Sequence, residues 1–198
     1  MAAGAGGGLP EVFRDWIAAQ QRVSDLRVEF RMTKTLPTLK ESVRSAGRFW
    51  SYVDGRFRWE TGKPVRSVLV FDGITLQAWE ASDNQWRKLD PHSSSMRLWM
   101  DFLGGRKLTE SGLLRDFQIA GLTEMKSLTR VILEPKSPRT RRNLKQIELQ
   151  FDTAEPRLVQ LLVRQGDGGS QTMDFDAPRR MTAADREVVP PPASPSNP

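Results

Sequence analysis

Cysteine is absent from this sequence of 198 residues, and histidine occurs once, at His92. Without cysteine the chain can form neither disulfide bonds nor thiol-based active sites, although the cellular compartment stays open. Metal ligands would have to be carboxylates alone, and no group of Asp and Glu residues has the spacing of a calcium-binding loop or an octahedral site. We therefore expect no metal site and no other cofactor.

Catalytic motifs are scarce as well. His92 adjoins three serines at 93–95, but neighbours in sequence need not form a pair of nucleophile and base in space. The serines more simply cap the helix predicted after them. The segment Gly166-Asp-Gly-Gly169 indicates a hairpin turn, because no helix follows to complete a phosphate-binding loop. We expect that the protein is not an enzyme.

Long hydrophobic runs are also missing. No apolar segment approaches the roughly 18 to 20 residues needed to cross a bilayer, so we expect no membrane span. Met1 to Gly8 contains only Ala and Gly after the methionine, without the basic and apolar regions of a signal peptide. This pattern fits a cytosolic protein, or a mature exported protein that carries a new start codon.

Basic residues outnumber acidic ones, with 30 Lys and Arg against 24 Asp and Glu, a net charge of +6 and a pI near 10.0. Clusters of Lys and Arg attract phosphate, so nucleic acid and anionic lipid headgroups are both candidate partners. Most arginines, however, alternate with apolar residues along predicted strands. This alternation favours solvated strand faces, and we expect no nucleic-acid partner.

The middle of the sequence predicts a β-sheet. Phe57 and Trp59 alternate with charged residues, the pattern of a strand with one polar and one apolar face. Asp72-Gly73 joins two apolar segments, Val65 to Phe71 and Ile74 to Trp79, and this dipeptide is a strong signal for a tight hairpin turn. A sheet with such an apolar face needs a cover.

Strand patterns recur along most of the chain. The regular alternation of Leu26 to Met32 predicts a half-buried strand. Further strands are predicted at Ser42–Val53, Gln85–Leu89, Phe117–Leu122, Leu128–Leu133, Leu144–Phe151, Leu158–Gln165 and Ser170–Phe175. Their connections are mostly too short for helical crossovers, so the sheet should be antiparallel. Gly47 lies where a bulge or strong bend would relieve curvature.

Two helices are expected among these strands. Pro10 to Arg22 has apolar residues at helical spacing and begins with a proline, which costs no hydrogen bond in the first turn. Met96 to Leu103 has only two polar residues, Arg97 and Asp101, so it is apolar over more than the single stripe of an ordinary surface helix. The second helix is therefore either part of a solid core or a lid over an apolar slot.

The predicted organisation is one β domain with two flanking segments. Residues 1–9 form a flexible N-terminus, residues 10–178 form the domain, and residues 179–198 form a C-terminal extension. From Pro190 this extension is rich in Pro and Ser, a composition that offers little to bury and predicts disorder.

Three motifs carry a resemblance to a known family. Gly55-Arg-Phe-Arg-Trp-Glu60 leads through Pro64 and Val68-Leu-Val-Phe-Asp-Gly73 to Leu76 and Trp79. Leu133-Glu-Pro-Lys136 precedes Asn143-Leu-Lys-Gln146, and the closing hairpin ends in Gln171-Thr-Met-Asp-Phe175. In this order and spacing, over residues 10–178, the chain resembles the periplasmic lipoprotein carriers of the LolA-like family.

The resemblance implies a mainly β fold with helices. Its strongly curved antiparallel sheet forms an incomplete half barrel, covered by an N-terminal helix and a mid-sequence lid helix. The acyl chains of lipoproteins, or another lipid, would bind in an apolar cavity between them. The implied cavity residues are Phe30, Phe49, Phe57, Trp59, Val68, Val70 and Trp79. The implied lid residues are Met96, Leu98, Trp99, Met100, Phe102 and Leu103.

The resemblance further implies a monomeric periplasmic carrier that moves lipoproteins towards the outer membrane, with inner-membrane donor and outer-membrane acceptor proteins as partners. We therefore expect the natural reading frame to begin upstream with a leader. The family usually has Arg-Pro before its Phe-x-Trp strand, and that Arg ties the lid shut. Val53 and Asp54 occupy these positions here, so Arg56 or Arg58 is the candidate tether. A sensor or protein-interaction domain on the same lipid-binding-like scaffold is the alternative function.

Overall fold

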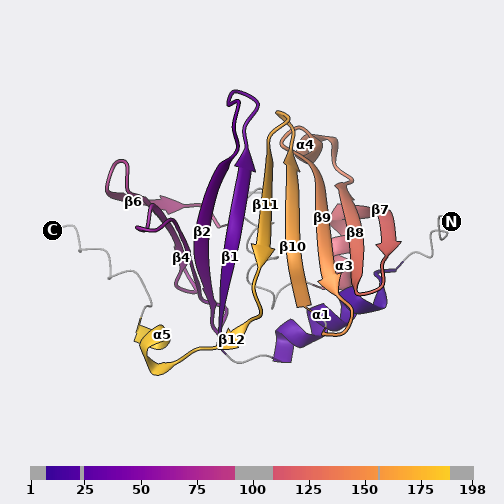
Figure 1. The fold of residues 1–198 in the computed structure, drawn as a ribbon, viewed down its shortest axis with the longest axis horizontal. Helices are drawn as coiled ribbons and strands as arrows, with labels where there is room; N and C mark the ends of the chain where they lie inside the picture. The colour runs from indigo at the N-terminus through magenta and orange to yellow at the C-terminus, as the bar shows by residue number, and fades with distance from the viewer. Residues whose placement is uncertain (1–7, 23–24, 92–108, 156, 188–198) are drawn as a thin grey trace.

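The computed structural model describes residues 8–22, 25–91, 109–155 and 157–187. Twelve strands form one antiparallel sheet in the order β6-β5-β4-β3-β2-β1-β11-β10-β9-β8-β7, and β12 pairs with β1 beside this series (Figure 1). The sheet does not close into a barrel, because no pairing joins β6 to β7 within the described ranges. No helix of these ranges has the length and hydrophobicity that a membrane crossing requires.

The strands confirm the predicted pattern of hairpins. Their bounds are β1 Leu26–Thr35, β2 Val43–Ser51, β3 Phe57–Thr61, β4 Ser67–Phe71, β5 Leu76–Glu80, β6 Gln85–Leu89, β7 Phe117–Glu124, β8 Leu128–Pro135, β9 Leu144–Asp152, β10 Arg157–Gln165, β11 Ser170–Phe175 and β12 Arg179–Arg180. The tight turns fall at the expected glycines. Gly55, Gly73 and Gly168 have φ values of 90°, 100° and 91°, in the left-handed region where a side chain would be strained.

Helix α1 (Glu11–Arg22) is the helix predicted at the N-terminus. Three shorter helices, which the sequence analysis did not predict, are α3 (Glu110–Asp116), α4 (Pro138–Arg141) and α5 (Ala183–Glu187). Helix α3 is capped by the Thr109 hydroxyl, which accepts a hydrogen bond from the Gly112 amide at 3.1 Å. The predicted lid helix at 96–103 lies outside the described residues.

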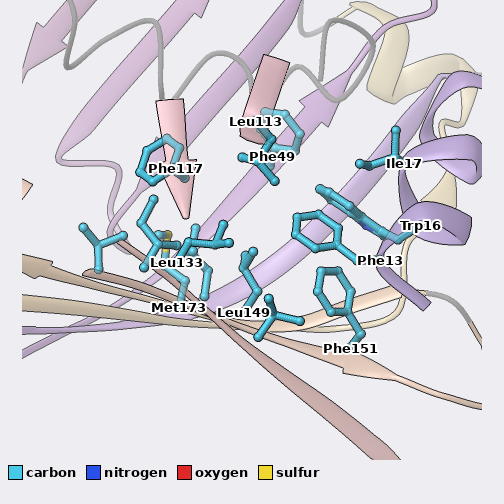
Figure 2. Close-up of a cluster of buried hydrophobic side chains, with 14 of the residues drawn as sticks. Phe13, Trp16, Ile17, Phe49, Leu113, Phe117, Leu133, Leu149, Phe151 and Met173 are labelled. Carbon is cyan, nitrogen blue, oxygen red and sulfur yellow. The ribbon is translucent and has the colours of Figure 1, made fainter. Parts of the chain in front are cut away.

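The main core occupies one face of the sheet, which we call the core face. Phe13 and Trp16 of α1 lie against Phe151 of β9, with ring centroids 4.8 and 5.5 Å apart (Figure 2). The same buried cluster includes side chains from the N-terminal strands, from the C-terminal strands and from α3, such as Leu113. The sheet therefore curves around its core, and α1 closes one side of it.

Gly47 has a different role from the predicted bulge. The registers of β2 with β1 and with β3 run through Gly47 without a shift. A Cβ at this position would collide with the Phe30 ring and with the Glu60 carbonyl oxygen. Glycine is therefore required for close approach, because the Phe30 side chain lies directly over the β2 backbone.

A second, smaller cluster covers part of the opposite face of the sheet. Trp50 and Tyr52 are buried there with Met181, which follows β12. The sequence analysis placed residues from 179 onwards in an extension beyond the domain. In the structure β12 continues the hydrogen bonding of β1 and α5 follows it, so residues 179–187 pack as part of the fold.

Candidate functional site

A partly open cavity of about 80 Å³ lies at one end of the sheet, where β1 and β10 begin and β2 and β11 end. Its lining residues are Trp16, Leu26, Val28, Phe49, Ser51, Arg157, Leu158, Leu161, Phe175, Asp176 and Pro178. Most of these side chains are apolar, and they come from four strands, from α1 and from the segment after β11. We call this cavity the pocket, and this end of the sheet the pocket end.

The walls of the pocket follow from strand alternation. Leu26 and Val28 are two residues apart on β1, and Leu158 and Leu161 lie on β10, where a register shift falls between 158 and 160. Trp16 approaches from α1. The deeper wall is rigidly packed, since Phe49 lies 5.5 Å from Trp59, measured between ring centroids. Helix and sheet together thus leave an apolar recess at the margin of the core.

The aromatic side chains next to the pocket form a continuous group. Phe30 stacks on Trp59 with ring centroids 4.1 Å apart and lies 6.2 Å from Phe175, a pocket residue. Phe49 also contacts Phe57 at 6.0 Å. Offset and tilted aromatic contacts of this kind stabilise a core beyond their buried area. The pocket is therefore continuous with the core.

Two charged residues line the pocket, and each forms an ion pair. Arg157 pairs with Asp152 at 3.4 Å, and Asp176 pairs with Arg31 at 3.3 Å. The backbone amides of Ala154 and Glu155, with a smaller contribution from Arg157, lower the pKa of Asp152 from its ordinary value. The other lining residues, except Ser51, are apolar.

The pocket offers few polar groups. Ser51 supplies a hydroxyl, but the described part of the chain contains no histidine to serve as its base. Within the same ranges no group of three or more His, Cys, Asp and Glu residues could hold a metal ion. An apolar recess with a paired polar rim fits one end of an apolar chain.

The structure brings together four of the seven predicted cavity residues. Phe30, Phe49, Phe57 and Trp59 all belong to the buried cluster on the core face. Only Phe49 lines the pocket itself. The other three aromatic rings lie behind it, in the packed interior.

Val68, Val70 and Trp79 lie on the opposite face of the sheet. Val68 is paired with Trp79 across β4 and β5, and Val70 stands opposite Arg58 on β3. Directly paired residues share a face, and neighbours along a strand alternate. The core face of β4 is therefore formed by Leu69 and Phe71, which pack on the cluster. The apolar run could not indicate which of its residues point inwards.

The two predicted tether residues form local ion pairs. Arg56 pairs with Asp54 at 2.7 Å and lies over the Tyr52 ring. Arg58 pairs with Glu60 at 2.7 Å on the face opposite the core. The six predicted lid residues (Met96, Leu98, Trp99, Met100, Phe102 and Leu103) lie outside the described residues, so the tether stays a prediction.

Sequence reasoning missed most of the pocket wall. Leu26 and Val28 were recognised as the apolar side of a strand, but nothing local distinguished them from other core residues. Leu158, Leu161 and Phe175 are far from them in sequence and meet them because β1 pairs with β11, and β11 with β10. The available signal was period-two alternation, which gives the face of a residue and not its place along the curved sheet.

One known family matches most of the chain. The family model "Outer membrane lipoprotein carrier protein LolA" matches residues 21–188. No curated protein matches the chain by sequence.

Several solved structures are similar to the chain. A domain from Vibrio parahaemolyticus described as outer membrane lipoprotein-sorting is 12% identical with a TM-score of 0.47, over 91% of this chain and 94% of that one. A LolA superfamily protein from Nitrosomonas europaea is 9% identical with a TM-score of 0.44, over 90% and 97%. The MucA/MucB complex of Pseudomonas aeruginosa gives 14% identity and a TM-score of 0.41, over 87% of this chain and 58% of that chain.

Proposed function

Because the chain belongs to the family of the outer membrane lipoprotein carrier protein LolA, we propose that it binds the acyl chains of lipoproteins, or of another lipid, in the pocket and carries them through the periplasm towards the outer membrane. The observation that supports this most directly is the apolar pocket beside the aromatic core. Donor and acceptor proteins in the inner and outer membranes would complete the transfer.

Binding a whole acyl chain requires the pocket to widen. At about 80 Å³ it is smaller than the roughly 300 to 1,000 Å³ of ordinary ligand pockets. Each buried methylene of the ligand contributes about 0.8 kcal/mol of binding free energy. This gain can offset the free-energy cost of separating side chains that are now in contact. The apolar segment Met96 to Leu103, predicted as a lid, would compete with the ligand for the same apolar surface.

The proposal is tested first by native mass spectrometry after mild purification. A co-purifying acylated molecule supports a carrier, whereas an empty protein that retains a protein partner supports the sensor or interaction domain. Binding of a fluorescent fatty acid then locates the site. Val28→Glu introduces a charge into the pocket wall, and we expect it to weaken probe binding about tenfold or more.

The matched control is Leu122→Glu on β7, where the side chain is 40% exposed and lies outside the pocket. It should leave probe binding unchanged. Circular dichroism of both variants separates loss of binding from loss of fold. Normal probe binding by a folded Val28→Glu variant would refute the pocket as the lipid site.

A further inference from the structure

Three turns lie at the same end of the sheet (Figure 1), opposite the end that holds the pocket. They are the β1–β2 loop, the α4 segment between β8 and β9, and the β10–β11 turn. The Gly166 amide donates a hydrogen bond to the Asn143 carbonyl at 3.0 Å. A Cβ on Gly168 would lie 3.7 Å from Cγ of Pro37. We call this surface, made of residues 34–44, 136–145 and 166–169, the basic end.

The surplus positive charge of the chain is concentrated at the basic end. Its basic residues are Lys34, Lys40, Arg44, Lys136, Arg139, Arg141, Arg142 and Lys145, and its acidic residues are Glu41 and Asp167. This surplus of six equals the net charge of the whole chain, +6. The remaining acidic and basic residues of the chain are therefore equal in number. The positive electrostatic potential of the protein is concentrated at this end.

These cations are available to an external partner. All except Lys34 are exposed. None of the eight takes part in an ion pair with another described residue. Lys136 and Arg141 donate only to the backbone carbonyls of Leu114 and Lys136. Exposed cations that form no ion pair attract anions that approach from solution.

Two exposed apolar side chains accompany the charges. Leu39 is 47% exposed next to Lys40, and Val43 is 50% exposed next to Arg44. At a membrane interface, apolar side chains enter the headgroup layer while neighbouring cations meet lipid phosphates. The three segments contain no aromatic residue, so they offer no stacking platform for single-stranded nucleic acid. This combination favours a membrane.

We propose that the basic end docks on a bilayer surface rich in anionic phospholipids, with the β1–β2 loop at the level of the headgroups. The pocket lies at the opposite end of the sheet, where β1 and β10 begin. Docking therefore leaves the mouth of the pocket directed away from the membrane. The contact is independent of the lipid-binding function proposed above, because no residue lines both surfaces.

The test measures co-sedimentation of the full chain with vesicles of equal parts phosphatidylglycerol and phosphatidylcholine. We expect binding that weakens as salt is raised, and none to vesicles of phosphatidylcholine alone. Arg139→Glu combined with Arg142→Glu should lower the affinity for anionic vesicles at least about tenfold, since each basic residue near such a surface contributes measurably. Leu39→Asn should remove the part of the binding that resists salt.

The control combines Lys126→Glu with Arg180→Glu, two exposed residues at the pocket end that give the same change in net charge. It should bind vesicles like the wild type, and thermal unfolding should show that each variant folds. Three results would overturn the proposal: no binding to anionic vesicles, equal loss in the control, or displacement from the vesicles by inorganic phosphate at constant ionic strength. Tighter binding to single-stranded DNA than to the vesicles would also overturn it, in favour of a nucleic-acid partner.

Discussion

Tyr52 is the only tyrosine in the chain, so its titration can be followed without overlap. Burial beside Trp50 and Met181 raises the pKa of its hydroxyl to about 12, and the positive charge of Arg56 offsets part of this effect. We predict that phenolate absorption appears near pH 12 in the folded protein and near pH 10 after denaturation. The stabilisation from the neutral phenol is complete below pH 10 and is lost as the pH rises through 12. A transition at pH 10 in the native protein would contradict this.

Gly47 permits the closest packing on the core face. A methyl group there would meet the Phe30 ring and the Glu60 carbonyl, and the backbone oxygen cannot move aside cheaply. We predict that Gly47→Ala lowers the free energy of unfolding by about 1 to 3 kcal/mol, the usual cost of overpacking. Gly121→Ala is the control, because its nearest neighbour is the flexible end of Ile132 at 3.1 Å. If urea denaturation shows equal losses of stability for the two variants, the Phe30 contact is unimportant.

Asp185 fastens the C-terminal segment to the sheet. Its carboxylate accepts hydrogen bonds from Arg27 at 2.8 Å, from the Trp50 indole at 3.2 Å, and from the Thr182 amide and hydroxyl at 3.0 and 2.9 Å. The Thr182 amide, followed by Arg27 and the other donors, holds the pKa of Asp185 well below its usual range. The stabilisation is therefore present above pH 4 and is lost as the pH falls towards the folded pKa.

We predict that Asp185→Ala lowers the free energy of unfolding at pH 7 by about 2 kcal/mol. This value lies between the free-energy cost of losing one neutral hydrogen bond and the cost of disrupting a fully buried ion pair. The cost stays below the second because Arg27 retains its contact with Glu29 at 2.7 Å. The variant should also lose less stability than the wild type between pH 5 and pH 2, as measured by chemical denaturation. Parallel pH profiles would rule out Asp185 as the source of the acid sensitivity.

At the scale of elements, β12 and α5 distinguish two parts of the C-terminal region. We predict that deleting residues 190–198 changes stability by less than about 0.5 kcal/mol, because their composition offers little to bury. Deleting residues 179–198 should cost several kcal/mol, since it uncovers Trp50 and Tyr52 and removes Asp185, one of the two carboxylates paired with Arg27. Thermal unfolding of the two truncated proteins makes the comparison. Similar melting temperatures would show that the segment 179–187 contributes nothing.

The elements themselves were largely predictable. Period-two alternation located β1, and Asp72-Gly73 located the β4–β5 hairpin, because both signals depend on neighbouring residues alone. Helices α3, α4 and α5 are four to seven residues long, too short to display a helical period. Strand β12 has two residues and exists only through its pairing with β1. Elements of this size depend on tertiary contacts.

At the scale of the whole molecule, the open sheet has two edge strands among the described residues, β6 and β7. Strand β6 has five residues and carries Arg87 and Lys88, and β7 contains a register shift between Ile119 and Gly121. Short, charged or irregular edges resist pairing with a second sheet. We predict a monomer of 22.4 kDa in sedimentation velocity at all accessible concentrations. A dimer that dissociates after Arg87→Pro would show instead that β6 is an interface.

The sequence by itself determined the class of the fold, the order of its strands along the chain and several aromatic side chains of its core, such as Phe57 and Trp59. These depend on alternation and turn chemistry, which are local. The tertiary structure alone decided that Val68, Val70 and Trp79 face away from the core, that Leu26 and Leu158 meet in one pocket, and that the cations gather at the opposite end. The first follows from pairing within neighbouring hairpins. The other two follow from strand pairing and sheet curvature, which join residues more than a hundred positions apart.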